Sequence, residues 1–258
     1  MSKRVLLYFF CILFISGIAQ TRRRNFRQGE LGFYGGGSYY IGDLNTRTHF
    51  LNSHPAGGIF FRYSSNYRFA FRFGLNVGQI SANDAASGQP DQMERNLNFT
   101  SKLYELQSTA EFNFVEYRIG HSRYKFTLFI FGGLGVFYFD PQNNNGTYLR
   151  GQYTEGQTTS YPRVQMSIPF GLGLKWNIGK KVGLGIEWGP RRTFTDYLDD
   201  VKGKNPETMV PIDTNGGTST TPAPGSMRGN PSTKDWYFFY GVTLNIKLPG
   251  RRPCHKEP

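Results

Sequence analysis

The chain has 258 residues, of which 38% are hydrophobic and 19% charged, with a formal net charge of +12 and a mean hydropathy of −0.47. These values exclude a bundle of membrane helices, because a spanning helix needs about 20 predominantly apolar residues, and after residue 19 the longest uncharged apolar stretch, residues 126–139, contains three glycines. The 32 glycines and the 16% aromatic content favour β-structure instead.

The first 19 residues have the pattern of a secretory signal peptide. Lys3 and Arg4 precede an apolar run over residues 5–15, and small residues Gly17 and Ala19 lie at the −3 and −1 positions of a cleavage site after Ala19. The sequence therefore predicts export. The mature chain then keeps Cys254 as its only cysteine, which excludes an internal disulfide.

Strict alternation of apolar and polar residues is the main pattern of the mature chain, and it predicts strands rather than helices. In residues 67–80, for example, Phe69, Phe71 and Phe73 share one face, while Arg68 and Arg72 share the other. The eight predicted strands cover residues 30–41, 57–63, 67–80, 103–114, 126–139, 163–178, 182–194 and 236–248.

Charged residues within these strands fall on the face opposite the apolar one. In a membrane barrel that face is the lumen, because one charge on the lipid face at mid-depth costs about 2–4 kcal/mol. Buried charges must be paired. We therefore predict a charge network in the lumen; a selective channel is the alternative. Its members are Glu30, Arg62, Arg68, Arg72, Glu105, Glu111, Arg163, Lys175, Glu187 and Arg191, with Lys247 on the same face.

A soluble β-sandwich would alternate too, but the lengths of strands and connections favour a membrane barrel. Several strands run 12 to 16 residues, longer than the ~5–6 typical of globular strands. Short connections alternate with long ones, as in outer-membrane barrels with periplasmic turns and external loops. The fold class is thus all-β: a single transmembrane up-and-down antiparallel barrel of about eight strands. Aromatic girdles are expected from Tyr39, Tyr40, Trp176, Trp188 and Trp236.

Two prolines, Pro169 and Pro190, fall inside predicted strands. A closed barrel has no edge at which a missing N–H is harmless. We expect bulges at these positions, or a strand that ends above the membrane at Pro190.

No set of residues predicts an enzyme, a metal site or a cofactor site. His49 and His54 share a loop without a carboxylate or cysteine at ligand spacing. The glycine runs 35–37 and 132–133 lie within predicted strands, where a nucleotide-binding loop does not occur. We therefore predict no catalytic residue, no cofactor and no small-molecule substrate.

Basic residues flank the barrel at both ends of the mature chain. The organisation expected is a signal peptide (1–19), a basic periplasmic segment (20–29), the barrel (30–248) and a basic periplasmic tail (249–258). The flanks either set orientation as solvated charges or dock an acidic periplasmic partner, and nucleic acid is excluded by compartment. The residues concerned are Arg22, Arg23, Arg24, Arg27, Arg251, Arg252 and Lys256.

Two stretches resemble a known family. Residues 30–45 (ELGFYGGGSYYIGDLN) resemble the first strand and loop of the PorG-like outer-membrane proteins of Bacteroidota, and residues 193–201 (TFTDYLDDV) resemble the segment that leaves that family's penultimate strand. The resemblance implies a non-enzymatic barrel of the type IX secretion machinery that associates with a periplasmic ring of PorK and PorN. The loop segment 213–233, rich in Gly, Pro, Ser and Thr, is an expansion relative to that family and predicts a flexible external tip.

Four aspartates of these stretches are expected at the outer rim. They serve loop and turn geometry, because Asp accepts backbone N–H bonds, or they form a shared rim network or contact a partner. They are Asp43, Asp196, Asp199 and Asp200.

Three functions remain open on the sequence. The first is an outer-membrane component of the type IX secretion apparatus. The second is a structural or adhesive barrel of the OmpX/OmpA type that acts through its outer loops. The third is a lipid-modifying barrel enzyme, which would require a lipid-facing Ser or His with a carboxylate close by.

Overall fold

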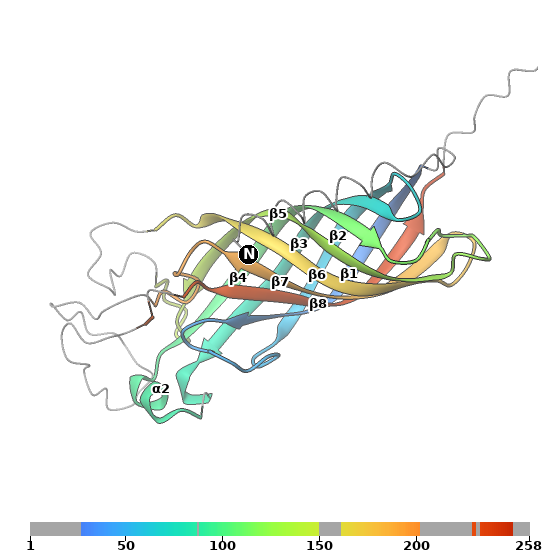
Figure 1. Ribbon diagram of the computed structural model, residues 1–258. Helices are drawn as coiled ribbons and strands as arrows, with labels where there is room; N and C mark the ends of the chain where they lie inside the picture. The colour runs from blue at the N-terminus through green and yellow to red at the C-terminus, as the bar shows by residue number, and fades with distance from the viewer. Residues whose placement is uncertain (1–26, 87, 150–160, 202–228, 231–232, 250–258) are drawn as a thin grey trace, which may run out of the picture.

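The computed structural model describes residues 27–86, 88–149, 161–201, 229–230 and 233–249. Eight antiparallel strands follow one another around a closed barrel, and β1 pairs with β8 to complete it (Figure 1). The predicted fold class is confirmed. The strands are β1 (Gln28–Ile41), β2 (His54–Ser64), β3 (Phe69–Asn83), β4 (Asn98–Asn113), β5 (Phe126–Gln142), β6 (Val164–Asn177), β7 (Val182–Thr193) and β8 (Trp236–Lys247).

Connections of very different length mark the two ends of the barrel. The turns 65–68, 114–125 and 178–181 lie at one end, together with the start of β1 and the end of β8; we call it the turn end. The connections 42–53, 84–97, 143–163 and 194–235 join the strands at the other, the loop end; 42–53 is as long as 114–125, and the other three are longer. The β3–β4 loop contains two short elements that alternation did not predict, η1 (Asp84–Ala86) and α2 (Pro90–Arg95), visible beyond the wall in Figure 1.

Outward side chains are apolar on all eight strands. Leu75, Leu106, Leu134 and Val242 are 56 to 60% exposed, and every strand contributes at least one large exposed apolar residue. This outward face extends around the whole wall, whereas soluble proteins rarely expose contiguous apolar patches larger than a few hundred Å². In the part of the chain that is described, no helix is long and apolar enough to cross a membrane.

The stagger of the strands fixes the width of the lumen. Following the pairings once around the wall from Glu30 leads back to β1 at Tyr40, ten residues beyond the start. Eight strands enclose an interior just wide enough for side chains to fill it. Side chains that point inward from opposite walls are therefore in contact across the lumen.

The two prolines interrupt the ladder without shifting it. Pro169 pairs with Arg191, and the β6–β7 pairing resumes at Leu172 with Trp188 in the same register. The β5–β6 pairing is likewise missing between Gly132 and Gly135 and resumes unchanged. The expectation of bulges was wrong, because a bulge adds a residue to one strand and none is added here. β7 also continues past Pro190 to Thr193.

Candidate functional site

Eight of the charged residues predicted to face inward lie inside the barrel, each at most 7% exposed. They comprise four cations and four anions, so the interior charges balance among the residues described. We call this set the charged lumen: Glu30, Arg62, Arg72, Glu105, Glu111, Lys175, Glu187 and Arg191.

Glu111 on β4 is the centre of the charged lumen. Its carboxylate lies 2.8 Å from Arg62 Nε, 3.3 Å from Arg72 Nε and 2.5 Å from Lys175 Nζ. These three cations come from β2, β3 and β6. Three positive charges in a low-dielectric interior require a carboxylate between them, because an unpaired buried charge costs several kcal/mol.

Each guanidinium at this centre also has a second carboxylate. Arg62 Nη1 donates to Glu30 (3.0 Å), and Arg72 Nη1 donates to Glu187 (2.6 Å). The second contact joins β3 to β7, which face each other across the barrel. It therefore spans the lumen.

One aromatic ring lies against both guanidinium groups. The Phe60 ring centroid lies 4.9 Å from Cζ of Arg62 and 5.1 Å from Cζ of Arg72. Cations are attracted to ring faces, which compensates for Arg62 Nη2 and Arg72 Nη2, two buried nitrogens without a hydrogen-bond partner. Gly32 makes the room: a Cβ there would lie 2.1 Å from the Phe60 ring.

Glu105 organises a second group nearer the loop end. Its carboxylate lies 3.3 Å from Arg191 Nε and accepts hydrogen bonds from Tyr237 Oη (2.7 Å) and Asn76 Nδ2 (2.8 Å). Tyr237 on β8 and Glu105 on β4 belong to opposite walls. The lumen is thus bridged at two levels, which argues against an open path for ions at either level.

Three predicted lumen cations lie elsewhere, at strand ends. Arg68 precedes β3, is exposed and donates to the carbonyl of Phe114 (2.9 Å). Arg163 precedes β6, and its side chain, 40% exposed, pairs with Asp140 at 3.2 Å. Lys247 is the half-buried last residue of β8. For Arg68 and Arg163 the inward assignment was wrong, because alternation fixes the side-chain direction only where the chain is pleated. Lys247 keeps the inward face of its strand, since it pairs with Glu30 and has the parity of buried Asn245.

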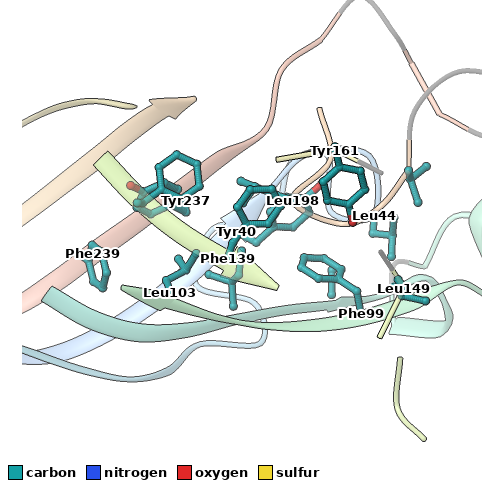
Figure 2. Packing of buried hydrophobic residues seen from close by; sticks show 14 of the residues in the cluster. Tyr40, Leu44, Phe99, Leu103, Phe139, Leu149, Tyr161, Leu198, Tyr237 and Phe239 are labelled. Carbon is teal, nitrogen blue, oxygen red and sulfur yellow. The ribbon is translucent and has the colours of Figure 1, made fainter. Parts of the chain in front are cut away.

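Loop side chains close the loop end of the barrel. Leu198 and Val201 are 0 and 1% exposed and belong to the core cluster that also holds Phe99 and Phe139 on the barrel wall (Figure 2). Tyr161 stacks on Phe139 and on Tyr197, with ring centroids 5.9 and 4.7 Å apart. We call the loop residues of this cluster the mouth plug: Leu44, Leu149, Tyr161, Tyr197, Leu198 and Val201.

A pair of carboxyl groups lies beneath the mouth plug. Tyr40 Oη is 2.5 Å from Asp199 Oδ2 and 2.9 Å from Asp235 Oδ1. A hydroxyl has one proton and can donate to only one of them. The second contact is a hydrogen bond when the other carboxyl is protonated and donates to Tyr40. Burial, with added repulsion from nearby carboxylates, raises the pKa of both Asp199 and Asp235 well above the ordinary value of 3.8, which agrees with a retained proton.

All four aspartates predicted at the outer rim are buried, at 1 to 9% exposure. Asp43 Oδ2 accepts the backbone N–H of Asn230 (3.0 Å), Asp199 Oδ1 accepts that of Val201 (2.9 Å), and Asp196 lies 3.8 Å from Lys234 Nζ. Asp200 has φ +59°, a conformation that Asp tolerates better than most residues. They therefore organise the loops, which is the first of the two roles expected for them, and their burial leaves little of their side chains for a partner to contact.

Sequence reasoning missed three members of this loop-end network. Asp235 directly precedes β8, Asp84 pairs with Arg95 through both carboxylate oxygens (2.7 and 2.8 Å), and Tyr40 was assigned to a girdle although its side chain points inward. Parity could have found Tyr40, because Ser38 and Tyr40 share the face of Glu30.

Among the described residues, His54 makes contacts that fit neither a catalytic triad nor a metal site. His54 Nε2 lies 2.7 Å from Ser81 Oγ, but Nδ1 is 3.3 Å from the amide of Gln79 rather than from a carboxylate. Within the described ranges no group of three His, Cys, Asp or Glu residues could hold a metal ion.

The turn end is strongly basic. Among the predicted docking residues Arg27 is exposed there, whereas Arg22, Arg23, Arg24, Arg251, Arg252 and Lys256, like the signal peptide and Cys254, lie outside the described residues. Five further exposed cations join Arg27, and Glu116 is the one acidic residue in the three turns. We call this surface the basic turn-end face: Arg27, Arg68, Arg123, Lys125, Lys180 and Lys181.

Comparisons with known proteins identify one family and several barrels. A family model described as a domain of unknown function, DUF6089, matches residues 3–257. No curated protein matches the chain. Solved structures similar to it include Ail, the attachment invasion locus protein of Yersinia pestis (9% identity, TM-score 0.43, covering 86% of this chain and 99% of Ail). Neisserial surface protein A is similar at 9% identity and a TM-score of 0.44, covering 86% of this chain and 97% of that protein. The outer membrane protein OprG of Pseudomonas aeruginosa is similar at 8% identity and a TM-score of 0.36, covering 85% of this chain and 94% of OprG.

Proposed function

The chain belongs to the DUF6089 family, and we propose that it is an integral outer-membrane barrel without enzymatic activity that serves in the type IX protein secretion apparatus. In this role the barrel is an anchor, and its turn end binds an acidic surface of the periplasmic secretion ring, PorK and PorN. The observation that carries the proposal is the basic turn-end face, with six exposed cations around one end of a barrel whose lumen is filled.

Membrane insertion is supported by the outward face. Strands of 11 to 17 residues are long enough to cross a bilayer at a tilt, and the closed barrel leaves no strand edge unpaired in lipid. The apolar residues exposed on every strand then lie in hydrocarbon. The predicted signal peptide and the even number of strands support an orientation in which the turn end faces the periplasm.

Two features support an anchor rather than an enzyme or a channel. Contacts that join opposite walls fill the charged lumen, and hydrogen-bonded carboxyl groups underlie the mouth plug. The pair of His54 and Ser81 lacks the carboxylate that a hydrolase triad requires. In this role the barrel fixes the position of its partners at the membrane and carries out no reaction itself.

The two stretches that resemble the PorG-like proteins form one structural unit. Tyr40 from the first contacts Asp199 from the second, and Leu44 packs in the same cluster as Leu198. A resemblance in both stretches is consistent with a shared loop-end structure, whereas the basic turn-end face supplies the surface for a partner.

The test is a mild-detergent pull-down of the tagged chain from outer membranes, with partners identified by mass spectrometry. We expect capture of the ring lipoprotein and its periplasmic partner, and loss of capture in an R123E/K180E/K181E variant and at high salt, because exposed charge pairs are screened. The control is K102E, an exposed cation at the loop end of β4, which should leave capture unchanged.

Capture of the barrel alone, with cargo secretion intact in a deletion strain, would contradict the secretion role. The OmpX/OmpA-like alternative would then be tested by replacing the outer loops. Equal loss of capture in K102E and in the triple variant would remove the basic turn-end face from the proposal.

A further inference from the structure

The part of the β1–β2 loop around Phe50 lies against the outside of the barrel wall, whereas Leu44 in the same loop belongs to the mouth plug. In Figure 1 this loop, in blue at the lower edge, runs beside the wall near β8. The Phe50 ring lies 4.9 Å from the rings of both Tyr39 and Tyr240, and His49 Nδ1 is 2.9 Å from Tyr39 Oη. These contacts fix the loop to β1 and β8.

Backbone geometry in the same loop is unusual. Phe50 has φ +64° and Asn52 has φ +50°. Asn tolerates the left-handed region, but a bulky residue rarely adopts it, and such strain persists only where the surroundings enforce it. The loop is therefore bent at a cost, and the result is an aromatic side chain placed on the outer wall.

The loop and the wall enclose a groove of about 650 Å³. Its sides are His49 and Phe50 on the loop and the outward side chains of β7 and β8: Ile186, Trp188, Tyr240 and Val242. The polar atoms of the rings beside the groove form hydrogen bonds within the protein. Trp188 Nε1 donates to Tyr39 Oη (3.0 Å), which also contacts His49. The groove therefore presents hydrocarbon and ring faces.

This groove opens onto the apolar outward face. Phe50, Ile186 and Val242 are 52, 48 and 58% exposed, and Ile186 and Val242 are paired neighbours in the β7–β8 ladder. The groove is thus continuous with the surface that faces lipid in the proposed setting. A free aqueous metabolite would have to reach it through the bilayer.

A cation lies on the outward face of β7, between the groove and the loop end of the strand. Arg191 points into the lumen, so Arg192 points outward, and it is exposed at the loop end of the strand. It lies four residues beyond Trp188, about 13 Å along the strand at ~3.3 Å per residue. Its partner in the ladder is Trp236, which carries no charge. A basic side chain at this height is positioned for a phosphate at the membrane surface.

We propose that this groove binds an acyl chain of a phosphate-bearing lipid of the outer leaflet, with Arg192 at the lipid's phosphate and Phe50 and Trp188 on either side of the chain. The site requires that the barrel be inserted in a membrane, and it is independent of the secretion role, which concerns the opposite end.

Trp188 provides a direct probe. A full-length variant with W176F and W236F keeps Trp188 as its single tryptophan, and it is reconstituted in vesicles of phosphatidylcholine. A fixed fraction of either brominated phosphatidylglycerol or brominated phosphatidylcholine is then added. We expect the anionic lipid to quench Trp188 with about fivefold higher relative affinity, the factor that one cation near an anionic surface supplies.

Variants separate the groove from general lipid contact. R192Q should bring the ratio of the two affinities to about one, while K102Q, another outward cation at the loop end, should leave it unchanged. F50A should lower quenching by the anionic lipid. A W188F/W236F chain reports from Trp176 near the turn end of the neighbouring strand, close to Lys180 and Lys181, and R192Q should leave its relative quenching by the two lipids unchanged. Arg192 and Lys102 are exposed, so their replacement should not disturb folding.

Several outcomes would overturn the proposal. They are equal quenching of Trp188 by the two lipids, a preference that survives R192Q, or a preference at Trp176 that R192Q also removes. Native mass spectrometry of the unmutated chain gives a second readout that does not depend on the tryptophan replacements. One retained phosphatidylglycerol, lost in R192Q and kept in K102Q, supports the site, and no retained lipid contradicts it.

Discussion

The charged lumen and the mouth plug both bury carboxyl groups, but they neutralise them by different means. In the lumen Glu111 has three cations within 3.3 Å. At the loop end Asp199 and Asp235 share the hydroxyl of Tyr40 and accept backbone N–H groups. Counter-charge stabilises the first group, and a retained proton stabilises the second.

The difference follows from where each region lies in the fold. Lumen residues are on strands, where the pleat directs side chains from several walls to one level, so cations of β2, β3 and β6 reach one glutamate. The residues beneath the mouth plug come from the loop after β7, the residue before β8 and the end of β1. The loop end, whose carboxyl groups retain protons, should therefore lose stability as the pH rises.

The largest expected effect is that of E111Q. It removes the one charge shared by Arg62, Arg72 and Lys175 and leaves three buried cations with fewer partners than charges. Breaking a buried ion pair by removing one partner costs about 3–5 kcal/mol. Urea unfolding of the vesicle-inserted protein, followed by tryptophan fluorescence, measures the loss.

The matched control is E116Q in the turn 114–125, where Glu116 is half-exposed. A partly exposed carboxylate contributes about 1 kcal/mol or less. If both variants lost the same free energy of unfolding, removing a carboxylate from the charged lumen would cost no more than removing one from the surface, and counter-charge would not be what stabilises the lumen.

A pH effect of intermediate size is expected at the loop end. The pKa of Asp199 and of Asp235 is raised by burial above the ordinary value of 3.8. The folded loop then holds protons that the opened loop loses. Its stability is full below 3.8 and is lost as the pH rises through the raised pKa, by up to ~1.4 kcal/mol per pH unit for each proton.

Hydrogen exchange of the Leu198 and Val201 amides, corrected for the intrinsic rate, tests this effect. Protection should fall with rising pH, and D235N should flatten the dependence and increase protection at high pH, because an amide reproduces the donor of a protonated carboxyl. Amides around Glu111 should show no such trend. A parallel trend in both regions would indicate global unfolding instead.

Alternation in the sequence was sufficient for the fold and for most of the lumen. Glu105, Glu111 and Lys175 were assigned to the inner face by parity alone, and each is buried there. Which cation contacts which carboxylate did not follow, because the contact between Arg72 and Glu187 depends on strand stagger and on opposite walls meeting across the lumen.

The loop end was less predictable. The two stretches that resemble PorG-like proteins pointed to Asp43 and Asp199, but a periodic pattern does not predict whether a loop folds inward. Asp235 lies 36 residues beyond Asp199 in sequence and became a partner only through the path of the β7–β8 loop. The groove beside Phe50 was missed for the same reason, since it depends on a left-handed backbone in the β1–β2 loop.

The smallest effect is expected where parity assigned a cation to the lumen and the structure places it at a strand end. R163Q removes a pair with Asp140 in which the arginine side chain is 40% exposed, and R68Q removes one exposed contact to a backbone carbonyl. Each should leave the free energy of unfolding almost unchanged, because exposed charge contacts contribute little. R72Q, four residues beyond Arg68 and inside the lumen, should cost several times more. If R68Q or R163Q instead destabilised the barrel as much as R72Q, these cations would belong to the charged lumen after all, and its balance of four cations to four anions would be wrong.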